Sequence, residues 1–145
     1  SKMIGLDGQK MSKSYNNTIA LREDPREVEK KIRTMPTDPA RIRRNDPGNP
    51  NNCPVWQLHQ VYSMEETQKW VKEGCTQASI GCVECKQPII ESVLKELKPI
   101  QERAKDYIES PDLVKSVVAE GCEKARKLAR DTMRDVREVM GIDLS

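Results

Sequence analysis

The 145 residues match the length of one ordinary domain and leave little room for a second. Charged residues make up 33% of the chain and aromatic residues 3%, with no Phe, so a core has to be built from aliphatic side chains. The formal net charge of +2 is too small to indicate nucleic-acid binding by itself. No apolar stretch could cross a bilayer and no signal peptide is evident, so we expect a cytoplasmic protein without a membrane partner.

The first part of the chain predicts an irregular arm and one helix. Residues 1–23 are rich in Gly, Ser, Asn and Lys and show no sustained period, which is typical of a loop. A helix is expected to begin after Asp24, which can cap it, with Pro25 at its first position. Residues 36–54 contain several Pro, Asn and Gly residues and predict a long irregular segment.

The rest of the chain predicts further helices. Residues 55–73 are expected to form one helix or two short ones with a break near Ser63, and residues 74–86 a tight loop. The last third predicts two long helices, one opening at Pro88 and one at Pro111. The predicted fold class is therefore all-α, a small helical bundle with an irregular N-terminal arm.

The motif with the clearest chemistry runs from Lys10 to Ser14 and reads Lys-Met-Ser-Lys-Ser. Lysines three residues apart, with two serine hydroxyls, suit a mobile clamp for phosphate groups. Nucleotidyl transfer depends mainly on positioning and on neutralising charge at phosphate oxygens. Nearby glycines would allow the loop to close over ATP and reopen. The alternative is a solvated basic loop, which would be the better interpretation of an arbitrary pair of lysines at this spacing.

These five residues spell the KMSKS signature, and the run GLDGQKMSKSYNNTI resembles the bacterial tryptophanyl-tRNA synthetases in particular. The similarity extends over nearly the whole chain and includes the segments 37–50 and 81–86 and the last helix. The resemblance implies that Lys10 and Lys13 contact the ATP phosphates, with Lys13 serving the transition state of tryptophan adenylation. It implies that Ser12 and Ser14 add donors and that the Met11 backbone lies near the adenine.

The resemblance also implies a division of the chain. Residues 1–23 would be the KMSKS loop at the tail of a catalytic Rossmann domain, and residues 24–145 a helical anticodon-binding domain. The other class I signature, HIGH, is absent, and so is the tryptophan pocket. The chain also lacks an initiator Met, which indicates a fragment. We therefore expect the full enzyme to be a tryptophan–tRNA ligase that joins tryptophan to tRNA(Trp) with ATP and Mg²⁺, and this piece to be inactive alone. A homodimer is expected from the family, through the absent domain.

Four of the five cysteines have the spacing of a metal site, C-x21-C-x6-C-x2-C, and they are Cys53, Cys75, Cys82 and Cys85. Both zinc and a [4Fe–4S] cluster accept four thiolates. Zinc sites usually use two short cysteine pairs, so the uneven spacing favours the cluster. A subset of the bacterial tryptophanyl enzymes carries such a cluster, with a slightly longer first gap. Four buried core thiols are the alternative. Cys122 is predicted to be a core thiol.

Contacts with tRNA are expected from basic residues near the irregular segment, which are Arg41, Arg43, Arg44 and Lys86. Such residues would bind phosphates and supply salt-dependent affinity. The last helix is also rich in Lys and Arg, but acidic residues alternate with them, so pairing along a solvated helix face explains its charge equally well.

Two rival functions remain at this point. A non-catalytic RNA-binding module with an iron–sulfur or zinc site would explain the cysteines but has no need of a mobile ATP clamp. The tyrosyl-tRNA synthetase shares the fold and the loop, but the segments that flank the motif resemble the tryptophanyl enzymes more.

Overall fold

The computed structural model describes residues 3–142 and confirms the all-α prediction for them. The helices are α1 (Pro25–Thr34), α2 (Pro54–Tyr62), α3 (Glu65–Thr76), α4 (Cys82–Glu109) and α5 (Pro111–Met140), with two 3-10 turns, η1 (Lys13–Tyr15) and η2 (Pro50–Asn52). The described residues contain no β-strand, only one isolated bridge between Ile4 and Lys10. The chain divides into two compact units, Ser1–Glu102 and Arg103–Ser145. Each is described by itself.

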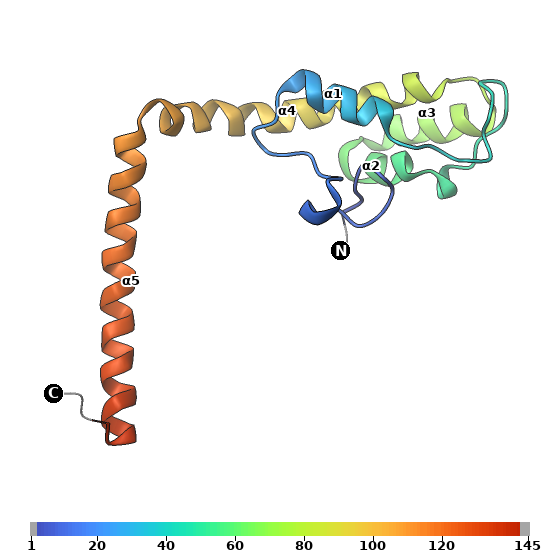
Figure 1. Ribbon diagram of the computed structural model, residues 1–145. Coiled ribbons are helices and arrows are strands. Elements are labelled where there is room, and N and C mark those ends of the chain that lie inside the picture. Colours follow the sequence, from blue (N-terminus) through green and yellow to red (C-terminus); the bar gives the residue numbers. More distant parts are fainter. Residues whose placement is uncertain (1–2, 143–145) are drawn as a thin grey trace. The chain divides into compact units, whose positions relative to one another are not determined.

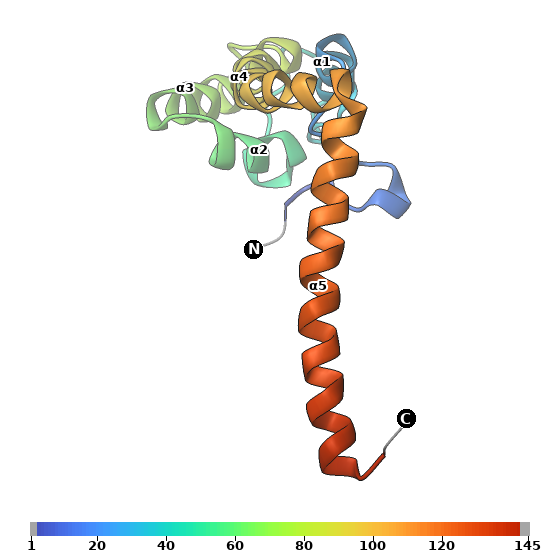
Figure 2. The ribbon, with the colours of Figure 1, turned by 90° about the vertical axis from the view of Figure 1, so that its left-hand side faces the viewer.

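The core of the first unit lies between α1, α2 and α4. Helices α1 and α4 lie side by side in both ribbon views (Figures 1 and 2). The core consists of aliphatic residues and one methionine, as the composition requires: Val28, Ile32, Met35, Val55, Leu58, Ile89, Ile90, Val93 and Leu97. From the N-terminal arm, Ile4, Leu6 and Ile19 pack against these residues, so the arm is anchored to the helices.

Helix α1 begins as predicted. The Asp24 carboxylate accepts a hydrogen bond from the backbone N–H of Arg26 at 2.8 Å, and Pro25 occupies the first helical position. The break predicted near Ser63 is also confirmed, because α2 ends at Tyr62 and α3 begins at Glu65. A local capping signal was therefore sufficient to place the start of α1.

The loop predicted for residues 74–86 was largely wrong. Helix α3 continues to Thr76 and α4 begins at Cys82, six residues before the predicted start at Pro88. The start of α4 has a capping arrangement, because the Glu84 carboxylate accepts a hydrogen bond from the backbone N–H of Gly81 at 2.9 Å. Pro88 falls in the second turn of α4, where it removes one backbone donor without ending the helix.

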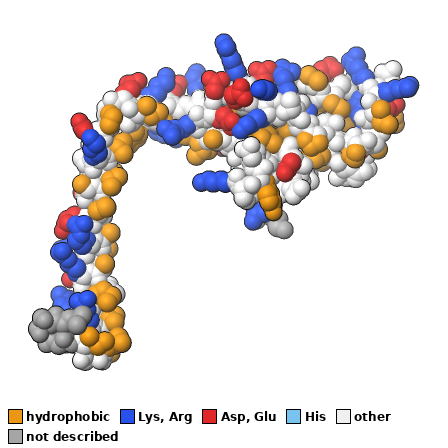
Figure 3. All heavy atoms as spheres, in the orientation of Figure 1, with side chains coloured by type: hydrophobic (Ala, Val, Ile, Leu, Met, Phe, Trp, Pro, Cys, Tyr) orange, Lys and Arg blue, Asp and Glu red, His pale blue; other side chains and the backbone are white. Residues whose placement is uncertain are grey.

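The second unit consists of the end of α4 and helix α5. Helix α5 begins at Pro111 as predicted and ends at Gly141, which has a φ of 65°. Its hydrophobic side chains line one edge in Figure 3, but none of its described residues is buried. The prediction of Cys122 as a core thiol was wrong, because its side chain is exposed. None of the described helices has the length and hydropathy needed to cross a membrane.

Candidate functional site

The arm that carries residues 10–14 is an ordered turn held by its own backbone. The N–H of Gly5 donates to the carbonyl of Gln9 at 2.6 Å, and the N–H of Met11 donates to the carbonyl of Met3 at 2.9 Å. The 3-10 turn η1 follows and ends at Asn16, which has a φ of 52°. The motif is therefore presented by a defined backbone, and the chain meets the core again at Ile19.

The structure places the predicted phosphate-binding side chains on the surface. Lys10, Lys13 and Ser14 are exposed, and the hydroxyls of Ser12 and Ser14 lie 2.8 Å apart. Met11 is partly buried and lines an apolar cavity of about 180 Å³ between the arm and the helices. Two exposed ammonium groups on an anchored arm are suited to an anionic ligand. Their contact with ATP stays a prediction.

The fold brings the four predicted cysteines into one neighbourhood. Cys53 precedes α2, Cys75 lies in the last turn of α3, and Cys82 and Cys85 lie in the first turn of α4. All four are partly buried. Burial, with the neighbouring sulfurs of Cys53, Cys75 and Cys82, raises the pKa of the Cys85 thiol to about 12. Sulfur atoms that disfavour the ionisation of Cys85 in this way lie near it.

The metal site itself is not confirmed. Within residues 3–142, no three or more His, Cys, Asp or Glu side chains are arranged to hold a metal ion. Binding of zinc or of an iron–sulfur cluster by Cys53, Cys75, Cys82 and Cys85 stays a prediction.

Arg41 lies beside Cys75 and is largely buried, with 9% of its surface exposed. Its guanidinium donates to the carbonyls of Arg44 and Ile80, each at 2.7 Å, and to the sulfur of Cys75 at 3.8 Å. Its Nε is buried and has no hydrogen-bond partner in the described part of the chain. The guanidinium lowers the pKa of the Cys75 thiol, although burial, the larger effect, raises it.

Gly48 makes this arrangement possible. Its N–H donates to the carbonyl of Cys75 at 3.0 Å, which joins the irregular segment to the end of α3. A β-carbon at this position would lie 2.6 Å from the sulfur of Cys75 and 3.2 Å from Cδ of Arg41. Any side chain here would push the cysteine or the arginine away, so the close approach depends on glycine.

His59 contacts Cys85 from helix α2. It is 0% exposed, with Nε2 3.0 Å from the carbonyl of Cys85 and 3.4 Å from its sulfur, and with Nδ1 2.8 Å from the Ser63 hydroxyl. Burial lowers the pKa of His59 to about 4, so the imidazole is neutral at pH 7. The neutral ring then carries its single N–H on Nε2 and donates it to the Cys85 carbonyl. The contact between His59 and Ser63 could have been expected from their spacing of one helical turn. The contact between His59 and Cys85 had no local signal.

The structure divides the predicted tRNA-binding residues into two groups. Arg43 and Arg44 are exposed and line an open groove of about 670 Å³, and Arg44 also forms an ion pair with Glu84 at 3.3 Å. Arg41 also lines this groove, but it is largely buried and its donors are directed to protein carbonyls and to Cys75. It therefore shapes the irregular segment.

Lys86 has a structural role in place of the predicted contact with tRNA. It is 4% exposed, and its ammonium donates to the carbonyls of Arg33 and Met35, each at 2.7 Å. These carbonyls lie at the C-terminal end of α1, where a cation satisfies unpaired acceptors and the helix dipole. A side chain held in this way is not at the surface, where an RNA phosphate could reach it.

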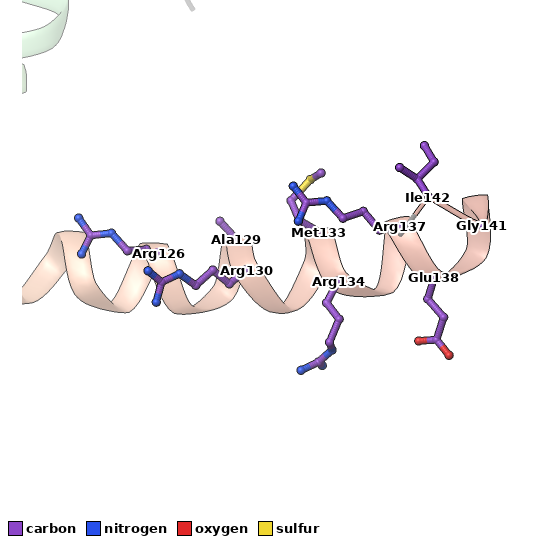
Figure 4. A pocket seen from close by; sticks show the side chains of 9 residues that line it. All are labelled: Arg126, Ala129, Arg130, Met133, Arg134, Arg137, Glu138, Gly141 and Ile142. Carbon is purple, nitrogen blue, oxygen red and sulfur yellow. The ribbon is translucent and has the colours of Figure 1, made fainter. Parts of the chain in front are cut away.

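Two interpretations of the charges of α5 were given: pairing along a solvated helix face, and contact with tRNA. The structure agrees in part with each. Lys124, Arg126 and Arg134 form ion pairs with acidic residues within one turn, as a solvated helix face predicts. Arg130 and Arg137 form no ion pair within the described residues and line an open groove along the end of the helix. Figure 4 shows Met133, Arg137 and Ile142 on one side of the helix and Arg134 and Glu138 on the other.

A comparison with known families identifies the class of protein. The model of the family described as tRNA synthetases class I (W and Y) matches residues 2–98, which include the arm, the cysteines and the core helices. The chain belongs to this family.

Relatives within the family are tryptophan enzymes. The chain is 60% identical over 145 residues to a tryptophan–tRNA ligase of Ralstonia nicotianae, covering 100% of this chain and 36% of the relative. It is 51% identical over 142 residues to the tryptophan–tRNA ligase of Thermotoga maritima, covering 97% of this chain and 43% of the relative. The chain thus spans less than half the length of these curated relatives.

A solved structure agrees with both the fold and the family. The tryptophanyl-tRNA synthetase of Campylobacter jejuni, complexed with ADP and tryptophan, is 29% identical to this chain with a TM-score of 0.81. The match covers 97% of this chain and 44% of that one.

Proposed function

We propose that this chain is part of a tryptophan–tRNA ligase and that it supplies the ATP-phosphate loop and a tRNA-binding helical region. The observation that supports this most strongly is the exposed Lys10 and Lys13 on an ordered arm, inside the segment that matches the synthetase family. The ADP bound to the Campylobacter relative supports ATP as the nucleotide. The names of the relatives favour tryptophan over tyrosine.

The proposed reaction has two steps in the full enzyme. A carboxylate oxygen of tryptophan attacks the α-phosphorus of ATP, pyrophosphate leaves, and the activated tryptophan is then transferred to tRNA(Trp). This chain would act on the first step, because Lys10 and Lys13 can neutralise the charge that accumulates on the departing pyrophosphate. Mg²⁺ would share that charge. The residues that bind tryptophan would come from outside this chain, and a homodimer is expected from the family.

The exchange of pyrophosphate into ATP tests this function in the full-length enzyme. We expect exchange to depend on added tryptophan and to be far slower with tyrosine at the same concentration. Exchange that tyrosine supports equally well would assign the chain to the other enzyme of the family. Binding of tRNA without any exchange would instead favour the non-catalytic RNA-binding module.

We also propose that the groove beside the cysteines contacts tRNA. Arg43 and Arg44 supply positive charge there, and two unusually exposed hydrophobic side chains, Ile42 at 86% and Val83 at 59%, lie among them. Arginine side chains neutralise RNA phosphates, and their planar guanidinium groups stack on unpaired bases such as those of an anticodon. Arg41 and Lys86 would support this surface from beneath.

We further propose that Cys53, Cys75, Cys82 and Cys85 hold a [4Fe–4S] cluster, with zinc as the alternative. Several features of the neighbourhood fit an anionic metal–thiolate group. Burial and the neighbouring sulfurs raise the pKa of the Cys75 and Cys85 thiols, which a bound cation would counter, and the buried Nε of Arg41 has no partner in the described part of the chain. The cluster would supply structural cross-linking between α2, α3 and α4.

Iron analysis of cysteine variants tests the cluster. We expect protein purified without oxygen to contain about four irons per chain, and Cys82→Ser to lose most of this iron because one ligand is missing. Cys122→Ser is the matched control, since Cys122 is exposed on α5 and lies outside the proposed set. Zinc without iron would support the alternative metal. Equal metal content in both variants would contradict the ligand set.

A further inference from the structure

Asn17 is an unexpected buried polar residue in the arm. Only 2% of its surface is exposed, although it lies in a polar segment three residues beyond the KMSKS motif. Its backbone carbonyl accepts a hydrogen bond from the N–H of Leu6 at 2.9 Å, so the segments before and after the motif meet at this residue. A buried amide of this kind is stable only if its donors and acceptor are satisfied.

The Asn17 side chain makes three hydrogen bonds, and two of them bracket the motif. Its oxygen accepts from the N–H of Ser12 at 2.7 Å, and its nitrogen donates to the carbonyl of Lys10 at 3.1 Å. The same nitrogen donates to the Asp7 carboxylate at 2.7 Å. The amide thus holds the backbone on both sides of Met11, within the first three residues of the motif.

The chemistry of these partners requires an amide at position 17. The N–H of Ser12 can only donate, whereas the carbonyl of Lys10 and the carboxylate of Asp7 can only accept. An aspartate at position 17 would place a second carboxylate against Asp7 and the Lys10 carbonyl. An alanine would remove the hydrogen bonds to all three partners. The hydrogen bond from Asn17 and the N–H of Gln9 also lower the pKa of Asp7, which keeps the acceptor ionised.

The approach of Gly5 confirms how closely this amide is packed. A β-carbon on Gly5 would lie 2.3 Å from the Asn17 side-chain nitrogen and 2.9 Å from its backbone carbonyl oxygen. A residue other than glycine at position 5 would therefore displace the amide. Gly5 thus leaves room for the Asn17 amide, and Asp7 accepts its hydrogen bond, so both residues hold Asn17 in place.

We propose that Asn17 is a positioning residue for ATP: it fixes the backbone at Lys10 and Ser12 so that the lysines meet the phosphates without a search through loop conformations. The inference rests on the ATP-binding role proposed above for the arm. Asn17 would act through the motif and would not touch the nucleotide. Preorganised charges accelerate nucleotidyl transfer because the enzyme does not have to order them at the moment of reaction.

Kinetics of the full-length enzyme test this role. For Asn17→Ala we expect kcat/KM for ATP in pyrophosphate exchange to fall about 100-fold, the size of effect that misplaced catalytic groups produce. The KM for tryptophan should not change. Asn16→Gly is the control, because Asn16 is exposed and its φ of 52° suits glycine. Asn17→Asp should be as impaired as Asn17→Ala, and adding Asp7→Asn should recover part of the loss by restoring one amide–carboxylate pair.

Limited trypsin digestion of the chain supplies a readout that needs no activity. Lys10 and Lys13 are exposed, so faster cleavage at these residues in Asn17→Ala than in Asn16→Gly is expected once the backbone is released. Unchanged cleavage would overturn the inference. Exchange that stays at the parent rate in Asn17→Ala but falls in Lys13→Ala would also overturn it and leave the proposed function standing. Exchange that stays at the parent rate in Lys13→Ala would reject the proposed function and this inference together.

Discussion

Replacement of Lys13 by alanine in the full-length enzyme is expected to slow tryptophan-dependent pyrophosphate exchange by about 10²- to 10³-fold. The reason is electrostatic. The negative charge on the pyrophosphate oxygens grows as their bond to the α-phosphorus breaks, and an ammonium group placed there stabilises this transition state more than the ground state. The loss should therefore appear mainly in kcat for exchange, whereas equilibrium binding of tryptophan should remain unchanged.

Lys69→Ala is a matched control for this experiment. Lys69 is as exposed as Lys13 but lies on α3, away from the arm, so its removal changes net charge without changing the clamp. Lys13→Arg adds a second comparison, because it keeps the charge but replaces a compact ammonium with a planar guanidinium, and it should be only partly active. If Lys13→Ala and Lys69→Ala exchange pyrophosphate at the same rate, the arm is a solvated basic loop and the proposed role in catalysis is wrong.

Replacement of Lys86 by methionine is expected to lower the free energy of unfolding of the chain by about 3 kcal/mol. Methionine fills a similar volume, but it leaves the carbonyls of Arg33 and Met35 without their buried donor. A buried acceptor without a partner lowers the stability of the folded state by more than its hydrogen bond had raised it, because water cannot replace the lost partner. Urea unfolding followed by circular dichroism measures this change.

Lys95→Met is the control, since Lys95 is an exposed residue of the same helix. Its effect should lie within about 0.5 kcal/mol, as is usual for surface substitutions. Comparable stability of both variants, together with weaker tRNA binding in Lys86→Met, would restore the original prediction that Lys86 contacts RNA. If Lys86→Met is less stable but its folded molecules bind tRNA as tightly as the parent, the role of Lys86 is structural.

Local pattern could predict the start of α1, the break between α2 and α3, the start of α5 and the KMSKS arm. Each depends on residues within about one helical turn of one another, because caps and turns are satisfied by their sequence neighbours. The same reasoning missed the start of α4, since the capping contact between Gly81 and Glu84 was read as part of a loop and the proline at 88 suggested a later start.

Burial could not be predicted in this way. Lys86 and Arg41 were expected at the surface as basic residues, yet their partners are the carbonyls of Arg33, Met35 and Ile80, about 40 to 50 positions away along the chain. Asn17 gave no signal at all, because its importance depends on how the arm folds back on Asp7 and Lys10. The spacing of the cysteines also gave no sign that Arg41 and Gly48 contact Cys75 or that His59 contacts Cys85, because these contacts follow from packing. A polar group can be buried only where the fold supplies hydrogen-bond partners for it. These partners lie far away in the sequence, so a local pattern cannot reveal them.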